Sequence, residues 1–416
     1  MLKKSVRKVI FDGFSLKGKT VKNDLFDTFF SKISLCVVQT KIKSDRLLGV
    51  VQHPENGLSY FVAGTWPGDM GEFEITDRAL NNKKYGYARL LRLMQPSPQR
   101  KTPECQFLGF SGKECSGCPW MIADYSSQLE QKKNRFLHAM RRAGFNPDTL
   151  DARSVHPAPN QIGYRNRFQV KTDGEKLGFV AEGSHHIVPI EDCLILNDTC
   201  RQHLHALRQH LPNRAWIPAP GNDWNFIDLD DQSPAEPVLL NRKQPFQQGN
   251  RAQNQWMKTW LGNKLEQHSP RRKIVELFCG SGNFTEVIAQ TGCPEILAYE
   301  ADSQAITALQ QKQLPNVTAR TADLYHPFIW KTLKKSTRNA DTLVLDPPRS
   351  GLKTLQGFFN TFAALETICY ISCDPITFAR DAWAFCRHGW ELADIQLVDL
   401  FPHTPHVEIM AVFRKH

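Results

Sequence analysis

Apolar runs recur through the C-terminal part of the chain, and each run ends in a turn that carries polar residues. The runs cover residues 273–279, 296–300, 341–346 and 367–371. Continuous apolar runs of this kind are typical of strands that are covered on both faces in a parallel sheet. They predict an α/β domain with a doubly wound, Rossmann-like sheet, in which ligands bind beyond the carboxyl ends of the strands.

The N-terminal part shows a different pattern. Residues 47–94 contain short strand-like runs separated by turns, which predicts a small β-barrel like those that bind oligonucleotides. Residues 81–85 place basic and aromatic side chains on a hairpin tip, which suits phosphate contact and base stacking, although a solvated tip explains them equally well. Residues 1–45 are basic and contain no motif that indicates a role.

A helix and several strands are expected between these two parts. The helix ends at Gly144, and its apolar face is formed by Leu129, Phe136, Leu137 and Met140. Its basic side chains are expected to be exposed, namely Lys132, Lys133, Arg141 and Arg142. Residues 162–195 alternate like strands, and Tyr164, Arg165 and Arg167 combine an aromatic ring with two guanidinium groups. They suit RNA contact, although solvated strand charges are an equally good explanation.

Composition limits the classes of protein that this chain can be. A length of 416 residues with 41% apolar residues indicates two or three globular domains. The expected division is an unassigned segment (1–45), a barrel (46–95), a central α+β domain (96–245) and an α/β domain (246–416). No apolar run reaches the roughly 18 residues that a membrane helix requires, so we expect a cytoplasmic protein without a membrane partner.

Charge and cysteine content point toward chemistry. The net charge of +10 favours a polyanionic partner, although a merely basic protein has the same charge. The 11 cysteines are expected to be reduced, so clustered ones indicate metal binding or catalysis. A cluster is formed by Cys105, Cys115, Cys118 and Cys193, with Cys200 as an alternative fourth member. Four thiolates select zinc or an iron–sulfur cluster, and the spacing leaves both open.

A glycine-rich turn follows the run 273–279. Gly280 and Gly282 let the backbone approach a ligand, and Glu300, 20 residues beyond Gly280, is placed to bind ribose hydroxyls. The third glycine of the dinucleotide fingerprint and the Lys-Ser/Thr pair of a P-loop are both missing here, which disfavours NAD and ATP. The pattern fits a nucleoside cofactor without a pyrophosphate.

Cys373 is the candidate nucleophile. It follows the apolar run 367–371 and precedes Asp374 and Pro375, which begin a helical segment. A thiol between a strand end and a helix N-terminus is expected to have its thiolate stabilised by the backbone N–H groups and the helix dipole. On this segment alone, a buried structural cysteine is an equally good explanation.

Four segments together resemble the RNA 5-methyluridine methyltransferases. They are ELFCGSGNFT (276–285), DPPRSG (346–351), SCDP (372–375) and FPHTPHVE (401–408). The resemblance implies a Rossmann-like domain that uses S-adenosylmethionine (SAM), a TRAM-type RNA-binding barrel at 46–95, and a [4Fe-4S] cluster on Cys105, Cys115, Cys118 and Cys193. It implies SAM contacts from Gln248, Phe278, Asn283, Glu300, Asp323 and Asp346. Cys373 would be the nucleophile and Glu408 the base.

The chemistry of uracil explains why such an enzyme needs both groups. Carbon 5 of uracil is a poor nucleophile, and addition of a thiolate at carbon 6 converts the ring into an enolate that can accept the methyl group. A carboxylate must then remove the carbon 5 proton so that the thiolate can leave. The target base has to be flipped out of the RNA to reach these groups. Asp374 is the alternative base, and His403 and His406 are expected to make turn or RNA contacts rather than bind a metal.

The expected function is therefore methylation of a uridine in RNA, with 23S ribosomal RNA as the expected substrate and a monomer as the expected form. Three alternatives are retained: the same reaction on transfer RNA, an amino-methyltransferase, and a non-catalytic RNA-binding or assembly protein. Arg349 argues against an amino-methyltransferase, because those sites favour an aromatic residue after the two prolines of residues 346–348. Cys373 and Glu408 argue against a non-catalytic protein.

Overall fold

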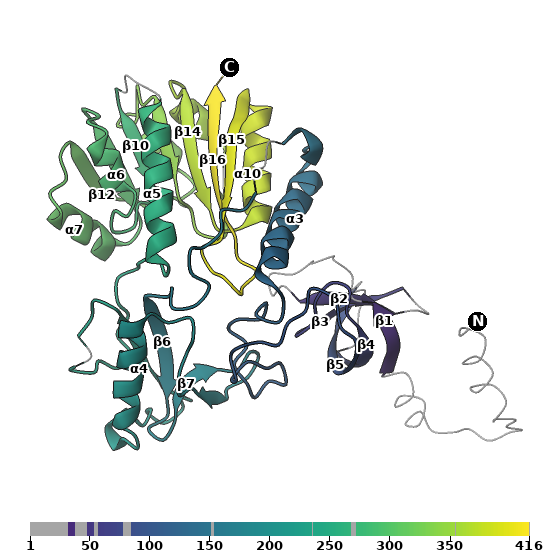
Figure 1. Cartoon of the computed structure of the whole chain (residues 1–416). Coiled ribbons are helices and arrows are strands. Elements are labelled where there is room, and N and C mark those ends of the chain that lie inside the picture. Colours follow the sequence, from purple (N-terminus) through teal and green to yellow (C-terminus); the bar gives the residue numbers. More distant parts are fainter. Residues whose placement is uncertain are drawn as a thin grey trace, which may run out of the picture. The chain divides into compact units, whose positions relative to one another are not determined.

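The computed structural model describes residues 32–37, 48–53, 57–77, 85–150, 154–234, 236–267, 272–353 and 355–415. The chain divides into two compact units, Met1–Pro98 and Gln99–His416 (Figure 1). Within the described ranges, every helix is too short or too polar to cross a bilayer.

The first unit contains a five-stranded sheet in the order β1-β4-β5-β3-β2. Its strands are β1 (Lys32–Val37), β2 (Gly49–Gln52), β3 (Ser59–Val62), β4 (Met70–Asp77) and β5 (Tyr85–Gln95). The edge strands β1 and β2 contact each other, so the sheet closes around a small core in the manner of the predicted barrel. β1 comes from the segment for which the sequence indicated no role. Residues 81–84 of the predicted hairpin tip lie outside the described residues.

A seven-stranded sheet dominates the second unit, in the order β12-β11-β10-β13-β14-β16-β15. The strands are β10 (Ile274–Leu277), β11 (Ile296–Glu300), β12 (Val317–Thr321), β13 (Thr342–Leu345), β14 (Thr367–Ser372), β15 (Trp390–Val398) and β16 (Glu408–Lys415). The first five strands in the sheet order are parallel, and β16 pairs antiparallel with both β14 and β15. This is the predicted Rossmann-like α/β sheet.

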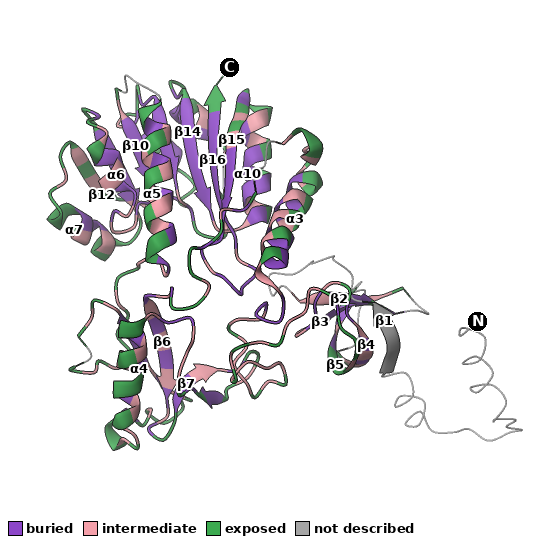
Figure 2. Cartoon of the chain, viewed as in Figure 1, coloured by how far each residue is buried: buried purple, intermediate pink, exposed green. Residues whose placement is uncertain are grey.

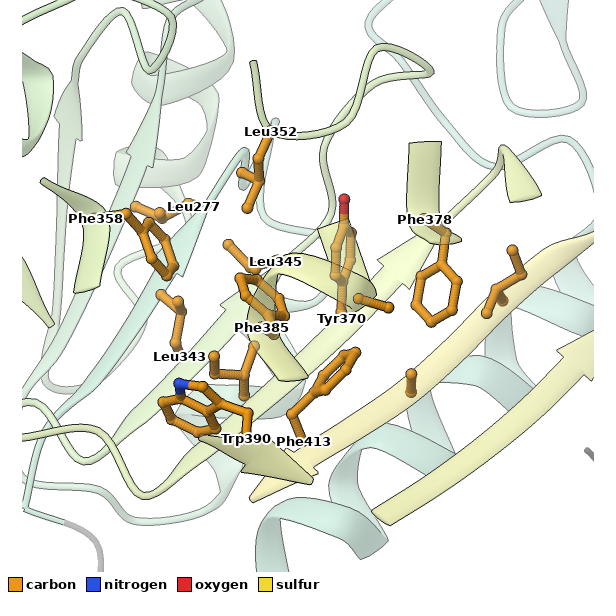
Figure 3. Close-up of a cluster of buried hydrophobic side chains, with 14 of the residues drawn as sticks. Leu277, Leu343, Leu345, Leu352, Phe358, Tyr370, Phe378, Phe385, Trp390 and Phe413 are labelled. Atoms are coloured by element: carbon orange, nitrogen blue, oxygen red, sulfur yellow. The ribbon is translucent and has the colours of Figure 1, made fainter. Parts of the chain in front are cut away.

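Helices cover both faces of this sheet, because successive apolar side chains along each strand point to opposite faces. Leu343 and Leu345 face one core, which Phe358 and Phe385 also line (Figure 3), whereas Val344 faces the other. The first core is covered by α8 (Ile329–Leu333), α9 (Phe358–Thr361) and α10 (Pro375–Arg387). The second is covered by α5 (Arg251–Glu266) and α6 (Thr285–Gln290). α7 (Ser303–Gln311) packs over β11 and β12. β10 and β14 are buried along their whole length (Figure 2).

Helix α3 (Tyr125–Ala143) packs on this sheet as well. It begins at the cap Asp124 and ends at Gly144, as predicted, and Phe136 and Met140 join the same core as α10. The prediction that Lys132 is exposed is wrong, because its side chain is fully buried. Helical periodicity explains this placement, since Lys132 lies three residues after Leu129 and four before Phe136, on the apolar face.

The remaining part of the second unit is a four-stranded antiparallel sheet in the order β8-β7-β6-β9. It consists of β6 (Arg167–Thr172), β7 (Leu177–Val180), β8 (Ile187–Pro189) and β9 (Asn225–Asp230), and α4 (Asp198–Gln209) packs on it through a separate apolar core. The short helices η1 (Pro147–Thr149) and η2 (Arg214–Trp216) lie in connections. Loops before α3 carry three of the clustered cysteines, and the fourth follows β8.

Candidate active site

The carboxyl edge of the seven-stranded sheet gathers the side chains that the sequence singled out. Phe278 follows β10, Glu300 ends β11, Asp346 follows β13, and Cys373 follows β14. Asp323 lies two residues beyond β12, in a turn where its carboxylate accepts a hydrogen bond from the Tyr325 N–H at 2.9 Å. Parallel strands bring their carboxyl ends to one edge, so this gathering follows from the topology.

Strand register places Glu408 beside Cys373. The antiparallel pair β14 and β16 aligns Ser372 with Ile409. One step further along this register, Cys373 stands opposite Glu408, the first residue of β16. Glu408 is buried and Cys373 is half-buried. The thiol and the carboxyl group therefore meet at the same edge, although 35 positions (408 − 373) separate them in the sequence.

Local contacts fix the turn that carries Cys373. The Asp374 carboxylate caps α10 by accepting hydrogen bonds from the N–H groups of Ile376 and Thr377, each at 2.9 Å. Pro375 occupies the first turn of the helix, where a missing N–H costs nothing. Thr377 Oγ1 also donates to the Arg349 carbonyl at 3.0 Å. Because Asp374 serves as the cap, it is a weaker candidate for the base than Glu408.

Cys373 is a protonated thiol in this environment. Burial raises its pKa to about 12, and the nearby charges of Glu408 and Asp346 act in the same direction, whereas Arg349 lowers it. Burial and these carboxylates oppose the stabilisation of the thiolate that was expected from the backbone N–H groups and the helix dipole. Any change that neutralises these carboxylates, or that brings a cation to the site, favours the thiolate.

The two carboxyl groups of the site have raised pKa values. Burial raises the pKa of Glu408 to about 8, and the charge of Asp346 adds to the shift, while Arg349 and Lys132 oppose it. Burial, with the charge of Glu300, raises the pKa of Asp346 to about 7. Carboxylates of this kind are much stronger bases than an exposed Glu, and such values are common where a protein transfers protons.

A cofactor cradle forms at the ends of β10 and β11. Glu300 Oε2 accepts a hydrogen bond from the Gly280 N–H at 3.2 Å, which joins the acidic strand end to the glycine-rich turn. Phe278 takes the left-handed conformation with φ 64°, which a residue with a side chain rarely adopts. Gly282 has a φ of 93°, which strains any residue with a side chain, and a Cβ there would also lie 2.4 Å from Leu309 Cδ1, so this position favours glycine. The backbone is thus shaped for close approach to a ligand.

Two further predicted contacts border this cradle. The amides of Asn283 and Asn254 exchange two hydrogen bonds of 2.9 Å, which fasten the glycine-rich turn to α5. Asn254 is a partner that the sequence did not indicate. Gln248 is half-buried, and the adjacent Gly249 packs so closely on Phe401 that a Cβ would lie 3.1 Å from the ring. The segment of Gln248 therefore lies next to the loop that leads to Glu408.

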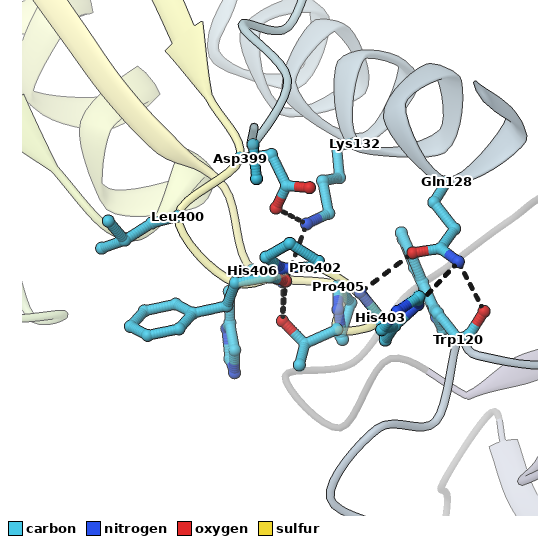
Figure 4. A network of polar contacts seen from close by, with 12 residues as sticks. Trp120, Gln128, Lys132, Asp399, Leu400, Pro402, His403, Pro405 and His406 are labelled. Carbon is cyan, nitrogen blue, oxygen red and sulfur yellow. Dashed lines mark hydrogen bonds and ion pairs between the residues drawn. The ribbon is translucent and has the colours of Figure 1, made fainter. Parts of the chain in front are cut away.

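The loop of residues 399–407, which joins β15 to β16, is held from several sides (Figure 4). Lys132 forms a fully buried ion pair with Asp399 and donates to the Phe401 carbonyl at 3.1 Å. Gln128 Oε1 accepts from the His403 N–H at 3.0 Å, and the Trp120 N–H donates to the His403 carbonyl at 2.9 Å. None of these contacts was predicted, although the position of Lys132 on an apolar face was a signal.

The two histidines of the loop are neutral. Burial lowers the pKa of His403 to about 4, and burial with the Arg349 charge does the same for His406. His403 Nδ1 lies 3.3 Å from Gln128 Nε2, and His406 Nε2 lies 3.4 Å from Arg349 Nη2. Both rings therefore make turn contacts, and His406 keeps Arg349 close to the edge that carries Cys373 and Glu408.

The segment of Tyr164 to Arg167 has structural contacts. Tyr164 is buried, and its hydroxyl donates to the Pro402 carbonyl at 3.2 Å. Arg167 pairs with Asp228 at 2.5 Å and donates to the Pro245 carbonyl at 2.6 Å. A role for Tyr164 in base stacking is excluded by its burial. Arg165, whose guanidinium lies 6.0 Å from the Phe401 ring centroid, stays the better candidate for RNA contact.

The four clustered cysteines come together beside this loop. Cys105, Cys118 and Cys193 pack around Met121 and Tyr164, next to Phe401. Burial, followed by the charge of the other thiols, raises the pKa of Cys118, and the pKa of Cys193 rises to about 11 for the same reasons, with Cys115 and Cys105 contributing. Because each of the other three thiols contributes to the raised pKa of Cys118, the four thiols lie near one another.

Cys200 lies in different surroundings. It is fully buried in the core beneath α4, and the charges that raise its pKa, after burial, come from Asp231 and Asp230. This arrangement favours Cys193 as the fourth member of the cluster. Within the described ranges, no group of three or more His, Cys, Asp or Glu side chains is arranged to hold a single metal ion as it stands.

Comparisons with known proteins agree with this geometry. A family model described as tRNA (Uracil-5-)-methyltransferase matches residues 329–416. A Nitrosomonas europaea protein named as an uncharacterized RNA methyltransferase is 79% identical over 89% of this chain and 95% of its own length. A 23S rRNA (uracil(1939)-C(5))-methyltransferase of Hahella chejuensis is 28% identical over 87% of this chain and 93% of its own.

Among solved structures, one similar fold is the tRNA (uracil-54, C5)-methyltransferase of Pyrococcus abyssi in complex with S-adenosyl-L-homocysteine. The TM-score is 0.65 with 21% sequence identity, and the match covers 91% of this chain and 99% of the other. At this identity the likeness concerns the fold, which extends over nearly the whole of both chains.

Proposed function

The chain belongs to the RNA (uracil-C5)-methyltransferase family, and we propose that it transfers the methyl group of SAM to carbon 5 of a uridine in 23S ribosomal RNA. The observation that carries this proposal is the register of β14 and β16, which sets the Cys373 thiol opposite the Glu408 carboxyl group. A nucleophile and a base at one sheet edge are what addition to uracil and loss of its proton require.

Cys373 opens the reaction. Its thiolate adds to carbon 6 of the flipped-out uracil, and carbon 5 of the resulting enolate takes up the methyl group. SAM, when bound, supplies that methyl group on a positively charged sulfonium. A cation near the edge favours the Cys373 thiolate, because it opposes both the burial and the neighbouring carboxylates that raise the pKa of this thiol to about 12.

Glu408 closes the reaction. As a carboxylate it removes the proton from the methylated carbon 5, and the bond between carbon 6 and the Cys373 sulfur then breaks to restore the ring and release the thiolate. A raised pKa, about 8, makes Glu408 a strong enough base for this carbon acid at neutral pH. The charge of Asp346, whose own pKa is also raised, contributes to this shift at Glu408.

The cradle at β10 and β11 fits the cofactor. We assign SAM contacts to Gln248, Phe278, Asn283, Glu300, Asp323 and Asp346. Glu300 is held by the Gly280 N–H at the end of a buried strand, where a carboxylate suits ribose hydroxyls. Gly280 and Gly282 keep side chains away from this part of the cradle. The left-handed backbone at Phe278 turns the chain toward the same edge.

We further propose that Cys105, Cys115, Cys118 and Cys193 hold a [4Fe-4S] cluster with a structural role. Four soft thiolates suit iron–sulfur or zinc. A cluster binds each thiolate through a different iron atom, so its ligands need not converge on one point as those of a single ion must. The gathered but unconverged thiols are consistent with that requirement. When bound, the cluster would tie the loops before α3 to the segment after β8.

The relatives support ribosomal RNA as the substrate. The H. chejuensis protein, named for 23S rRNA, matches along most of both chains, as does a Pectobacterium atrosepticum protein of the same name at 27% identity. Transfer RNA is the second candidate, favoured by the description of the family model for residues 329–416. The reaction belongs in the cytoplasm, and one copy of the chain suffices because Cys373 and Glu408 come from the same chain.

The test is direct. The purified protein is incubated with SAM and unmodified transcripts of 23S rRNA or of transfer RNAs, and the digested nucleosides are identified by mass spectrometry. We expect 5-methyluridine at one position of 23S rRNA. Methylation of transfer RNA alone would show that the substrate is transfer RNA and not 23S rRNA. Methylation of a base nitrogen or of an exocyclic amine would contradict the proposed chemistry.

A further inference from the structure

Helix α3 contributes three side chains to the 399–407 loop that leads to Glu408, and Figure 4 shows two of them, Gln128 and Lys132. Gln128 accepts from the His403 N–H, Lys132 donates to the Phe401 carbonyl, and Arg135 donates to the Pro405 carbonyl at 2.9 Å. Successive members are four and three residues apart, a spacing that puts all three on one face of the helix. The loop is thus fastened along one side of α3.

Lys132 is the unusual member of this set. Its ammonium group and the Asp399 carboxylate are fully buried together, and the other oxygen of Asp399 accepts from the Tyr125 hydroxyl at 2.7 Å. A buried ion pair adds little stability compared with apolar residues of the same size, because both charges lose their hydration. The ion pair instead restricts the conformation of the loop. Lys132 can donate to both Asp399 and the Phe401 carbonyl only when the loop brings these two groups together.

We propose that Lys132, assisted by Arg135, is a positioning residue for the base Glu408. By fixing Asp399, Phe401 and Pro405, α3 sets where β16 begins and so aims its first side chain at the carbon 5 proton of the Cys373 adduct. This inference rests on the proposed function. The charge of Lys132 also reaches Glu408, where it helps to hold the pKa of that carboxyl group below the value that burial alone would give.

The two halves of the reaction depend differently on this contact. Cys373 lies on a turn held by its own helix cap, through Asp374. Addition to uracil and methyl transfer therefore need no help from Lys132. Removal of the carbon 5 proton needs the Glu408 carboxylate in place. Loss of the α3 contacts should slow the second half and spare the first.

Three variants separate these effects. Arg135→Met removes the hydrogen bond to Pro405 at a half-buried position and leaves the core intact. Lys132→Met with Asp399→Asn removes both buried charges together, while the new amide carbonyl can still accept from Tyr125. Lys132→Met alone would leave a buried carboxylate unpaired and endanger the fold. Arg142→Met, at an exposed position in the last turn of α3, is the control.

Two measurements report on the two halves. Covalent trapping by an RNA that contains 5-fluorouridine, in the presence of SAM, follows addition and methyl transfer, because fluorine cannot leave as a proton. Tritium release from RNA labelled at carbon 5 of uridine follows proton removal. We expect trapping rates within about twofold of the control for every variant. Tritium release should fall about 10-fold in Arg135→Met and about 100-fold in the double variant, as expected when a reacting group is displaced by about 1 Å.

Each outcome is decisive. If the unmutated protein and Arg142→Met form no covalent complex, the proposed function itself is wrong, and the positioning role falls with it. If both trap RNA and the variants release tritium at the control rate, Lys132 and Arg135 do not position Glu408. Equal losses of trapping and release would also overturn the inference, because the contacts would then serve folding in general.

Discussion

The nucleophile and the base stand side by side, yet the chain fixes them in opposite ways. The turn that carries Cys373 is held chiefly by neighbouring groups, through the Asp374 cap on the N–H groups of Ile376 and Thr377. The loop that leads to Glu408 is held by side chains 267 to 275 positions away, from Gln128, Lys132 and Arg135. One half of the site is local, and the other depends on the tertiary fold.

This difference has a chemical counterpart. Addition of the thiolate starts the reaction, and the turn that positions Cys373 for it is a strand end followed by a helix N-terminus, which a short sequence can encode. Proton removal comes last and requires a carboxylate with a raised pKa, which only burial against distant segments can provide. A disturbance of remote packing should therefore stall the reaction after methyl transfer rather than prevent it from starting.

The largest effect on methyl transfer is expected from a change at Cys373, in the locally held part of the site. Cys373→Ala removes the atom that adds to carbon 6, so methyl transfer should fall by at least about 10⁴-fold, with no covalent RNA complex. Binding of SAM and RNA should persist, since neither requires the thiol. Cys386→Ala, which alters another half-buried thiol near the end of α10, is the matched control and should retain full activity.

The next largest effect belongs to the base. Glu408→Gln keeps the shape of the side chain and should lower tritium release from carbon 5 by about 10²- to 10⁴-fold. Asp374→Asn preserves a good helix cap while removing the rival carboxylate, and it should leave release within a few-fold of normal. The reverse ranking of the two variants would assign the base to Asp374.

The pH dependence sharpens the same comparison. The pKa of Glu408 is raised to about 8, so the carboxyl group is protonated and inactive as a base at lower pH, and its active form increases as pH rises. When proton removal is followed from the methylated Cys373 adduct once it has formed, tritium release should increase about 10-fold between pH 7 and pH 9 and then level off, because ionisation of Cys373 no longer contributes. The residual release of Glu408→Gln should lack this rise. A rate that falls with increasing pH would show that the group needed is an acid.

A smaller effect on proton removal is expected from changes in the four clustered cysteines. Cys118→Ser should abolish iron and sulfide binding, and it should slow proton removal roughly fivefold, since Trp120, two residues away, supports the loop at His403. Cys200→Ser, in the core beneath α4, should retain the iron. Purified anaerobically, the unmutated protein should be brown. A metal content of about one zinc per chain without iron or sulfide would refute the iron–sulfur cluster, although the same four cysteines would then be the zinc ligands.

The local half was also the predictable half. The strand before Cys373, the turn at Asp374 and the helix after Pro375 all follow from neighbouring residues, and the structure has all three. The parallel strands of the sheet and the place of Glu300 at the end of a strand followed as well. Patterns of this kind act over a few residues, so a single sequence suffices to find them.

The part of the site around Glu408, which depends on distant segments, could not be predicted from sequence patterns. Glu408 was identified through resemblance, because nothing near it indicates that its strand lies beside Cys373. Lys132 was expected at the surface, since its partner Asp399 is 267 positions away. Tyr164 was one of the residues that suited RNA contact, whereas in the structure its buried hydroxyl donates to the Pro402 carbonyl. The loss of thiolate stabilisation at Cys373 likewise arises from burial and from Asp346 and Glu408.

The most direct test of the covalent mechanism is the mass of the complex that Glu408→Gln leaves behind. The variant is incubated with SAM and the RNA substrate, digested with nuclease and protease, and examined by mass spectrometry. The mechanism predicts a peptide containing Cys373 that carries one uridine nucleotide with an added methyl group. A methylated RNA product with no nucleotide on Cys373, or a nucleotide attached to a different residue, would contradict it.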